Sequence, residues 1–488
     1  MQCPDGAPPP CRAAARGPSA NSVAVLYFEN VTRDSGDAYL ADGLTEAIIV
    51  RLGQVGRLEV KSRGAVRRYR ESQHEPVAIG RQLGVAHLVS GTVRRAGPRL
   101  RVTVELVRSS NGNQLWAEQF DRAGTDLLAI EEDVARAVAT AITGRLLSDE
   151  RSRLARSPTR NPAAYDRYLR GNYYLALRTL PGTARAIREF EAAIAADPAF
   201  SRALARTAYA YSLALGWGWT IDGLPRDSML ARGNALADRA LALDSGAADA
   251  WLAKGSLLPP TGRMRGLLGL VDRAIALDPR NDEARHYRGW ANFVGAYDLA
   301  QADADFRAAL ALEPQRAVTQ WYRGLLRYMQ RRYEESVALA ESALVIDPGF
   351  LMASALRVMN NVHLGRLDAA RTELAAIEAG NFTGPLAGMV EMAGIIYEHR
   401  VGDTAAMNRR LERLRPQDAG GGRVEWHVPL ALLRAHLRNT DEAVAELRRG
   451  LVPSALDWIV LQMPDFDVLR PHPAFQQFLE TIRPESPQ

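Results

Sequence analysis

The chain has 488 residues, of which 47% are hydrophobic and 24% are charged. Its length exceeds what one hydrophobic core can serve, so we expect about two to four folded units, and its composition excludes collagen-like, low-complexity and wholly disordered chains. The 61 lysines and arginines outnumber the 56 acidic residues, which gives a formal net charge of +5. Lys61 and Lys254 are the only lysines and neither follows a glycine, so a Walker-type phosphate-binding loop is excluded.

Residues 1–21 form a leader rich in Pro, Gly and Ala that we expect to be disordered. It holds the two cysteines, Cys3 and Cys11, which lie too far from the rest of the sequence to cross-link a core and lack further ligands for a metal. The leader has no apolar segment typical of a signal peptide, and the sequence has no run of about 18 apolar residues. We therefore expect no membrane span in this chain and a cytoplasmic protein, or a periplasmic one if a membrane span precedes it.

Residues 22–147 change periodicity several times, which indicates a mixed α+β domain. A short apolar run at residues 23–28 predicts a buried strand, and apolar residues at every fourth position from Leu40 to Leu52 predict an amphipathic helix. Alternating residues and two turns further on predict an antiparallel meander. The predicted order is β-α-β-α-β-β-β-α, with elements at residues 23–28, 40–52, 58–61, 77–83, 87–94, 100–107, 114–120 and 127–146.

The same residues resemble the TolB-like amino-terminal domain of bacterial regulatory proteins, through the motifs FEN, ADGLTE, SGTVRRAG and LWAEQFDR. Members of that family carry the module beside winged-helix DNA-binding domains, nucleotide cyclases or Ser/Thr kinase domains. The resemblance implies an α+β fold and a role in regulation. The kinase pattern itself is absent from the sequence, because Gly80 stands where the phosphate-pairing lysine would be and Asp467 replaces the glycine of a DFG sequence.

Past a polar hinge at residues 148–162 the sequence becomes helical in pattern and repeats itself. Each unit ends in an acidic residue, followed by proline in four cases and by serine in one, at Asp197, Asp244, Asp278, Glu313 and Asp347. The intervals between these residues are 47, 34, 35 and 34, and an insertion at residues 216–225 explains the long one. A period of about 34 residues is typical of tetratricopeptide repeats.

A small residue recurs at the eighth position of consecutive units, where two antiparallel helices approach closely, at Ala208, Gly255, Gly289 and Gly324. We therefore expect an all-α tetratricopeptide solenoid of about seven or eight helix pairs at residues 163–450. The last residues, 451–488, contain MPDFDVLRPHPAFQQFLETI, which resembles the terminal segment common after such arrays and implies a helical cap and a tail.

A stack of helix pairs forms a curved solenoid whose concave groove is lined by the first helix of each pair and commonly binds peptides. The positions that face this groove in the family predict a mainly aromatic and apolar lining: Tyr209, His286, Trp290, Phe293, Trp321, Leu325, Tyr328 and Met359. The same register adds Arg202, Glu283 and Met352. Such a lining favours an apolar or amphipathic segment of a protein partner. Each aromatic residue fits the core between repeats equally well, and that alternative stays open.

Residues 51–108 contain 13 lysines and arginines against 4 acidic residues, a local charge of +9. They predict a basic patch made of Lys61, Arg63, Arg67, Arg68, Arg70, Arg94, Arg95, Arg99 and Arg101. A patch of this kind suits phosphate or an acidic partner. Tyr69 is the single aromatic residue interleaved with these bases for stacking on nucleotides, so we do not expect nucleic acid to be the main partner.

The sequence offers no pattern for catalysis, a cofactor or a metal. Its eight histidines form no His-Glu-x-x-His sequence, and no serine occupies Gly-x-Ser-x-Gly. Glu131, Glu132 and Asp133 begin a predicted helix, where we expect them to be solvated. We therefore predict a non-catalytic regulatory or scaffold protein of bacterial signal transduction that binds a protein partner through the groove. The alternative is the sensory half of a transcriptional or kinase regulator that contacts DNA or an acidic partner through the basic patch.

Overall fold

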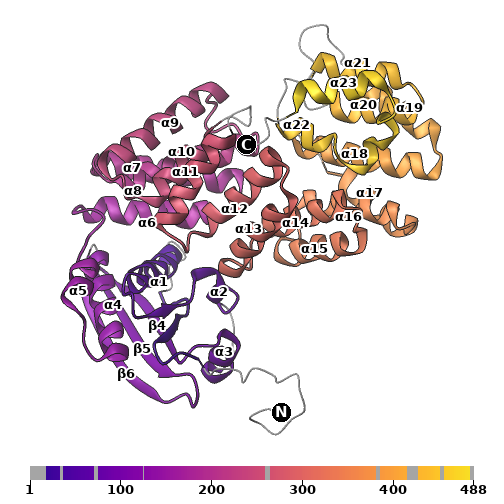
Figure 1. The fold of residues 1–488 in the computed structure, drawn as a ribbon. Helices are drawn as coiled ribbons and strands as arrows, with labels where there is room; N and C mark the ends of the chain where they lie inside the picture. The colour runs from indigo at the N-terminus through magenta and orange to yellow at the C-terminus, as the bar shows by residue number, and fades with distance from the viewer. Residues whose placement is uncertain are drawn as a thin grey trace, which may run out of the picture. The chain divides into compact units, whose positions relative to one another are not determined.

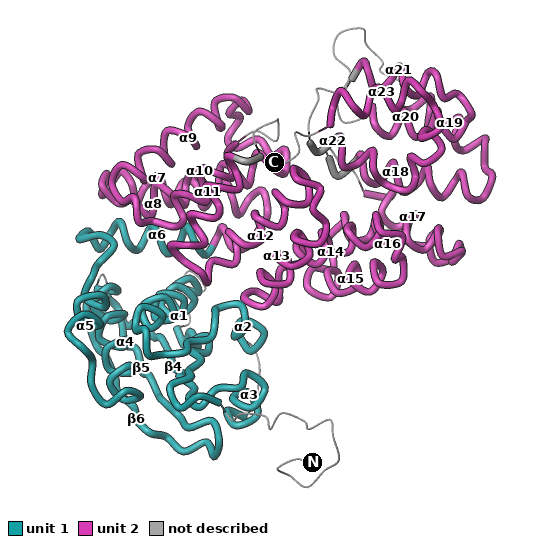
Figure 2. The backbone as a smooth tube through the Cα atoms, in the orientation of Figure 1, with its two compact units in different colours: residues 1–173 teal, residues 174–488 magenta. Residues whose placement is uncertain are grey.

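The computed structural model describes residues 18–32, 37–70, 75–124, 126–258, 264–380, 385–414, 427–450 and 455–483. The chain divides into two compact units, Met1–Tyr173 and Tyr174–Gln488, which Figure 2 draws in different colours. The expected leader lies outside the described residues except for residues 18–21, so Cys3 and Cys11 are not among them.

The first unit carries the strands and helices of the mixed domain (Figure 1). Its elements are β1 (Ser22–Val25), β2 (Glu29–Asn30), α1 (Ala38–Gly53), β3 (Glu59–Val60), α2 (Arg63–Arg67), α3 (Pro76–Leu83), β4 (His87–Ala96), β5 (Arg99–Arg108), β6 (Gln114–Ala123), α4 (Leu127–Thr143), α5 (Ser148–Leu154) and α6 (Pro162–Ala176), which extends past the unit boundary.

The strands form one mixed sheet in the order β3, β1, β4, β5, β6, and β2 pairs with β4. Strand β1 lies parallel to β3 and β4, whereas β4, β5 and β6 form the predicted antiparallel meander. Val89 pairs with Leu106 and Val93 pairs with Val102, so these buried side chains share one face of the sheet. Helices α1 and α4 pack against each other and against strands of the sheet.

The element order of the first unit agrees with the prediction, and three details differ. The strand expected at residues 23–28 ends at Val25, and the short β2 follows it. The helix α2 was not predicted. The residues expected to form a polar hinge, 148–162, contain α5, whose Leu154 is buried and whose residues contact α4. Apolar burial therefore holds the first half of this segment in a folded helix.

The carboxylate of Glu131 in α4 is buried, so the prediction of a solvated helix start is wrong for this residue. It accepts hydrogen bonds from the hydroxyl of Tyr165 at 2.8 Å and from Nε of Arg51 at 3.3 Å. Glu132 and Asp133, its neighbours, are half-exposed as a helix surface would be. The error arises because the arginine that neutralises Glu131 lies 80 residues earlier in the sequence.

The second unit is helical throughout its described residues (Figure 1). Its elements are α7 (Leu180–Ala196), α8 (Ser201–Gly216), α9 (Arg226–Leu243), α10 (Ala248–Ser256), α11 (Met264–Leu277), α12 (Asp282–Ala291), the π-helical turn η2 (Asn292–Ala296), α13 (Leu299–Leu312), α14 (Ala317–Met329), α15 (Tyr333–Ile346), α16 (Leu351–His363), α17 (Leu367–Glu378), α18 (Pro385–Val401), α19 (Thr404–Leu414), α20 (His427–His436), α21 (Thr440–Gly450), α22 (Ala455–Val460), the 3₁₀-helix η4 (Pro464–Leu469) and α23 (Pro473–Ile482).

From α8 to α21, the described helices of this unit form seven consecutive contacting pairs, which fits the predicted number. We call α8, α10, α12, α14, α16, α18 and α20 the first helices. The small residues between paired helices have the expected cause: a Cβ atom on Gly289 in α12 would lie 2.7 Å from the ring of Phe306 in α13. The helices of this pair therefore approach as closely as glycine allows.

The C-terminal helices differ from the repeats. Helix α23 contacts α21 and η4 contacts α20, both in the last pair, as a cap would, whereas α22 contacts η2. Across the described stretches of both units, no helix is both long and apolar enough to span a lipid bilayer.

Candidate functional site

The C-terminal segment meets the first helices of the array through Asp465, which lies in η4. Its carboxylate accepts a hydrogen bond from the hydroxyl of Tyr328 at 2.6 Å, and its other oxygen lies 3.0 Å from Nε2 of His363. The hydroxyl of Tyr328 and Nε2 of His363 are 2.9 Å apart. We call Tyr328, Arg331, Tyr333 and His363 together the Asp465 site.

The ends of three helices position this site. Tyr328 lies in the last turn of α14, Tyr333 begins α15, and His363 ends α16. Between α14 and α15 the chain reverses through Arg331, whose φ of 60° is left-handed. The ring of Tyr333 stacks on the imidazole of His363, with 4.5 Å between ring centroids and an angle of 1° between planes. This stacking holds the imidazole plane in which Nε2 meets Asp465.

The Asp465 site encloses a charged group among apolar neighbours. Asp465 is buried, and Phe466 and Leu469 of the same 3₁₀-helix are fully buried. Burial, followed by the carboxylate of Asp465, raises the pKa of Tyr328 well above its ordinary value. The hydroxyl therefore stays protonated and donates to the carboxylate at neutral pH. A second carboxylate, Asp467, forms an ion pair with Arg331 at the more exposed edge.

The same C-terminal segment makes an aromatic contact further back in the array. Trp458 in α22 lies edge-on to the ring of Tyr297, with 4.8 Å between centroids and an angle of 88°. Tyr297 follows η2, the π-helical turn that ends α12, and has a left-handed φ of 53°. Non-glycine residues adopt this conformation at a cost in free energy, and π-helical turns are frequent at functional sites.

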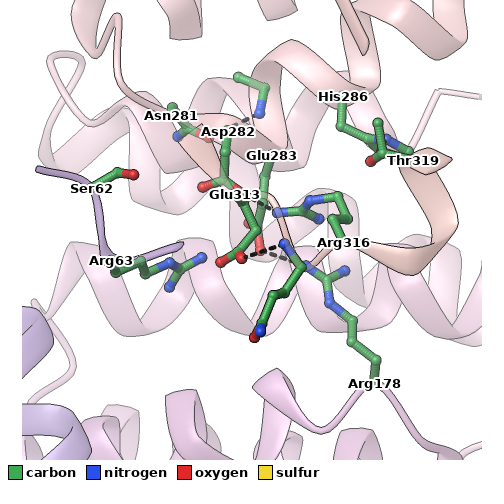
Figure 3. Close-up of polar contacts among 12 residues, drawn as sticks. Ser62, Arg63, Arg178, Asn281, Asp282, Glu283, His286, Glu313, Arg316 and Thr319 are labelled. Atoms are coloured by element: carbon green, nitrogen blue, oxygen red, sulfur yellow. Dashed lines mark hydrogen bonds and ion pairs between the residues drawn. The ribbon is translucent and has the colours of Figure 1, made fainter. Parts of the chain in front are cut away.

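A second polar cluster joins α8, α12 and the residue before α14, and Figure 3 draws most of it. Glu283 accepts hydrogen bonds from Arg178 at 2.7 Å and from Arg206 at 3.0 Å. The adjacent Asp282 forms an ion pair with Arg316. Both carboxylates are buried, and a buried carboxylate requires such partners. We call these five residues the Glu283 network, which links non-consecutive repeats.

His286 extends this network toward α14. Its Nδ1 lies 2.8 Å from the hydroxyl of Thr319. Burial, followed by the nearby charges of Arg316 and Arg178, holds the pKa of His286 well below its ordinary value. The imidazole is therefore neutral at physiological pH and acts as a hydrogen-bonding group of the interior.

Most of the eight residues predicted to line a peptide groove have buried side chains. Tyr209, Phe293, Tyr328 and Met359 are at most 1% exposed, His286, Trp321 and Leu325 are also buried, and Trp290 is half-buried. The burial of seven of these side chains fits the alternative that the sequence left open, in which they form the core between repeats. Tyr328 is nevertheless the residue that holds Asp465, and a role of the other seven in peptide binding stays a prediction.

The predicted basic patch is partly neutralised within the first unit. Five of its nine residues pair with carboxylates: Arg63 with Glu46, Arg70 with Asp42, Arg95 with Asp37, and Arg99 and Arg101 with Asp121. Three of these four carboxylates lie in or directly before α1. The +9 of residues 51–108 therefore overstates the charge that the folded surface offers.

Sequence reasoning missed Arg331, Tyr333 and His363 as site residues, and it treated Asp465 and Asp467 only as a failed kinase motif. One signal was available. Two acidic residues flank Phe466 in a segment that is otherwise suited to an apolar cap, and such charges call for partners. Among the residues that the structure describes, no three His, Cys, Asp or Glu side chains gather as a metal site would require.

No model of a known protein family matches the chain. Over 186 residues, 38% of its length, the chain is 31% identical to a protein of Rhizobium meliloti named putative adenylate cyclase 3. The matched part is 32% of that protein, so the chain spans about a third of the length of this curated relative.

Several solved structures are similar in fold to parts of the chain. A tetratricopeptide repeat protein from Parabacteroides merdae is 13% identical over 56% of this chain and 98% of its own, with a TM-score of 0.37. PilF of Pseudomonas aeruginosa is 17% identical over 44% of this chain and 91% of its own, with a TM-score of 0.34. TolB of Acinetobacter baumannii is 18% identical over 27% of this chain and 30% of its own, with a TM-score of 0.20. The tetratricopeptide architecture itself rests on the helix pairs and the 34-residue interval between them.

Proposed function

We propose that this protein is a non-catalytic scaffold that binds a segment of another protein on the first helices of its tetratricopeptide array. One observation carries the proposal. Tyr328 and His363, on two successive first helices, hold the carboxylate of a segment that is not a repeat. Hydrogen-bonding side chains on this face thus suit a short segment with an acidic group and apolar neighbours. Helical solenoids commonly use this face to bind peptides.

The preferred partner is an amphipathic segment with at least one carboxylate. The sequence predicted an apolar or amphipathic partner and did not specify a carboxylate. Buried Tyr328 offers a protonated hydroxyl, and Arg331 offers a positive charge at the edge of the site. Hydrogen bonds to a charged group are stronger and more directional than neutral ones, so they favour a carboxylate over an uncharged side chain.

We assign the scaffold to bacterial signal transduction. Two observations support this: the resemblance of residues 22–147 to the TolB-like domain of regulatory proteins, and the 31% identity with the protein named putative adenylate cyclase 3. The cytoplasm is the compartment that we propose, with the periplasm as the alternative stated above. Contact of the basic patch with DNA or an acidic partner is not favoured, because five of its nine bases already pair with carboxylates.

A displayed library of random peptides tests the proposal. The full chain and its Asp465→Asn variant are both used for selection, and hydrogen exchange maps where each selected peptide protects the protein. We expect peptides rich in acidic and apolar residues that protect α14 and α16. If neither chain selects a peptide that protects any first helix, the proposed function is wrong.

A further inference from the structure

We propose that residues 464–469 are an intramolecular ligand, which a partner segment with an aromatic residue between two acidic residues displaces from the Asp465 site. The inference rests on the proposed function and names the chemistry of its partner. Asp465, Phe466 and Asp467 form such a sequence. The site holds both aspartates, and Phe466 between them is fully buried.

The reach of the C-terminal segment exceeds what a cap needs. A cap has to cover the exposed face of the last pair, α20 and α21, and contacts of α23 with α21 and of η4 with α20 meet that need. The partners of Asp465 lie instead at the ends of α14 and α16, and Trp458 meets Tyr297 after α12. The segment therefore contacts four repeats, those that begin with α12, α14, α16 and α20.

The hydrogen bonds of Asp465 are those of a contact that recognises a specific side chain. An apolar side chain at position 465 would cover the helices without the desolvation of a carboxylate. The structure instead has a buried aspartate with a donor on either side, and hydrogen bonds of this kind fix both identity and register. Tyr333 stacks on the imidazole of His363 and so fixes the plane of the ring whose Nε2 meets the carboxylate of Asp465.

The edge of the Asp465 site is exposed enough for a partner segment to replace residues 464–469. The side chains of Arg331 and Asp467 are 58% and 38% exposed, and that of His363 is 26% exposed. The segment itself is a single short 3₁₀-helix, a form with few internal hydrogen bonds, so its conformation depends on the surface that holds it. Release can begin at Asp467, where water replaces the ion pair, before Asp465 leaves its buried partners.

Occupation by a tethered segment lowers the apparent affinity for a free one. The apparent dissociation constant is the intrinsic one divided by the fraction of sites that are open. A tethered ligand competes at a high effective concentration, so a partner needs either a stronger version of the same sequence or a second contact on the chain.

The test measures binding of a fluorescein-labelled synthetic peptide of residues 458–472 to the full chain by fluorescence anisotropy. Asp465→Asn removes the charge from the internal segment without changing its size, and the unaltered peptide then competes with a weakened rival. We expect this chain to bind the peptide at least about tenfold more tightly than the unchanged chain does, which is the fold-change that loss of one charged hydrogen bond gives. Asp467→Ala, a change at the exposed edge, should give a smaller gain in the same direction.

Two controls make the result specific. Tyr328→Phe, added to Asp465→Asn, should abolish the gain because it removes the hydroxyl that the peptide needs. Asp441 makes another aspartate–histidine contact, 2.9 Å from His472 and outside α14 and α16. The Asp441→Asn variant should bind the peptide as the unchanged chain does.

Three outcomes would overturn the inference. The first is equal affinity in the unchanged, Asp465→Asn and Asp467→Ala chains with unchanged circular dichroism and melting temperature. The second is a gain that persists with Tyr328→Phe. The third is a stable dimer of the unchanged chain in sedimentation, which would assign the segment to exchange between two copies. If library peptides bind both chains equally, the intramolecular ligand is wrong and the scaffold function stands. If the labelled peptide behaves as expected and the library selects no peptide, residues 464–469 are an intramolecular ligand of the site and the proposed scaffold function is wrong.

Discussion

The hydroxyl of Tyr328 lies 2.6 Å from the carboxylate of Asp465, a residue that follows it by 137 positions in the chain. This contact ties the C-terminal segment to a repeat in the middle of the array. Its strength follows from the low polarity around it, because both residues are buried and the acceptor is charged.

Tyr328→Phe is expected to loosen the C-terminal segment. The change removes one donor to a buried carboxylate, so the free energy of local opening of η4 should fall by about 1.5–3 kcal/mol. Hydrogen exchange of the amides in residues 464–469 measures this opening. Tyr297→Phe is the matched control, since the ring of Tyr297 makes its contact with Trp458 without the hydroxyl. Equal exchange rates in the two variants would contradict the prediction.

Glu131→Leu is expected to destabilise the first unit strongly. Arg51 would keep its buried guanidinium without this carboxylate, and breaking a buried ion pair from one side costs about 3–5 kcal/mol. Urea unfolding followed by circular dichroism measures the loss.

The double change Arg51→Met and Glu131→Leu gives the control for that experiment. Replacing both charges by apolar side chains of similar size removes the unpaired charge, so the loss should be smaller by at least about 2 kcal/mol. A double variant as unstable as the single one would mean that Arg51 and Glu131 do not act as a pair.

Gly289→Ala and Gly269→Ala are expected to change stability in opposite directions. Alanine favours a helix over glycine by about 1 kcal/mol, so Gly269→Ala in α11, where no atom lies within 4 Å of the added methyl, should stabilise the array. The methyl at residue 289 would lie 2.7 Å from the ring of Phe306, so that variant should lose about 1–3 kcal/mol. Melting temperatures of the two variants provide the comparison, and a rise in both would refute the close approach of α12 and α13.

Stability of the array is expected to fall as the pH drops from about 6.5 to about 4. Burial, followed by the neighbouring His399, lowers the pKa of His436 to about 4, and the two rings stack with 3.9 Å between centroids. The unfolded chain takes up a proton near pH 6.5 and the folded chain does so only near pH 4, so the stabilisation is complete above the first value and is lost toward the second.

The linked change in unfolding free energy is on the order of 2–3 kcal/mol over this interval. His436→Gln cannot take up the proton and should flatten the pH dependence between pH 6.5 and 4. Denaturant unfolding at a series of pH values measures the slope, and an unchanged slope in the variant would show that another group is responsible.

The elements that the sequence predicted correctly are those with a strong local pattern. The meander of β4, β5 and β6 follows from alternation and from two turns, and the helix pairs follow from a period of 34 residues. The errors occur where a distant partner overrides the local pattern. Glu131 looks like a solvated helix start until Arg51 neutralises it, and residues 148–154 look like a linker until Leu154 is buried.

The site divides in the same way. A repeat register predicts which residues lie on the first helices, because helical periodicity determines which residues share a face. The register does not determine whether a side chain meets solvent or a neighbouring helix. Phe293 and Met359 were expected in a groove and are buried. Arginine charges were likewise counted from the sequence, whereas Asp37, Asp42 and Glu46 of another segment neutralise three of them.

The amino-acid sequence alone therefore determined the class of fold, the repeat length and the absence of a Walker loop, because each depends on residue types at short and regular spacing. The tertiary structure decided which carboxylates are buried, which arginines are paired and where the C-terminal segment docks. These features depend on contacts such as that of Tyr328 with Asp465, between residues more than 100 positions apart. Packing of the whole unit brings such residues together, and local sequence patterns do not predict these contacts.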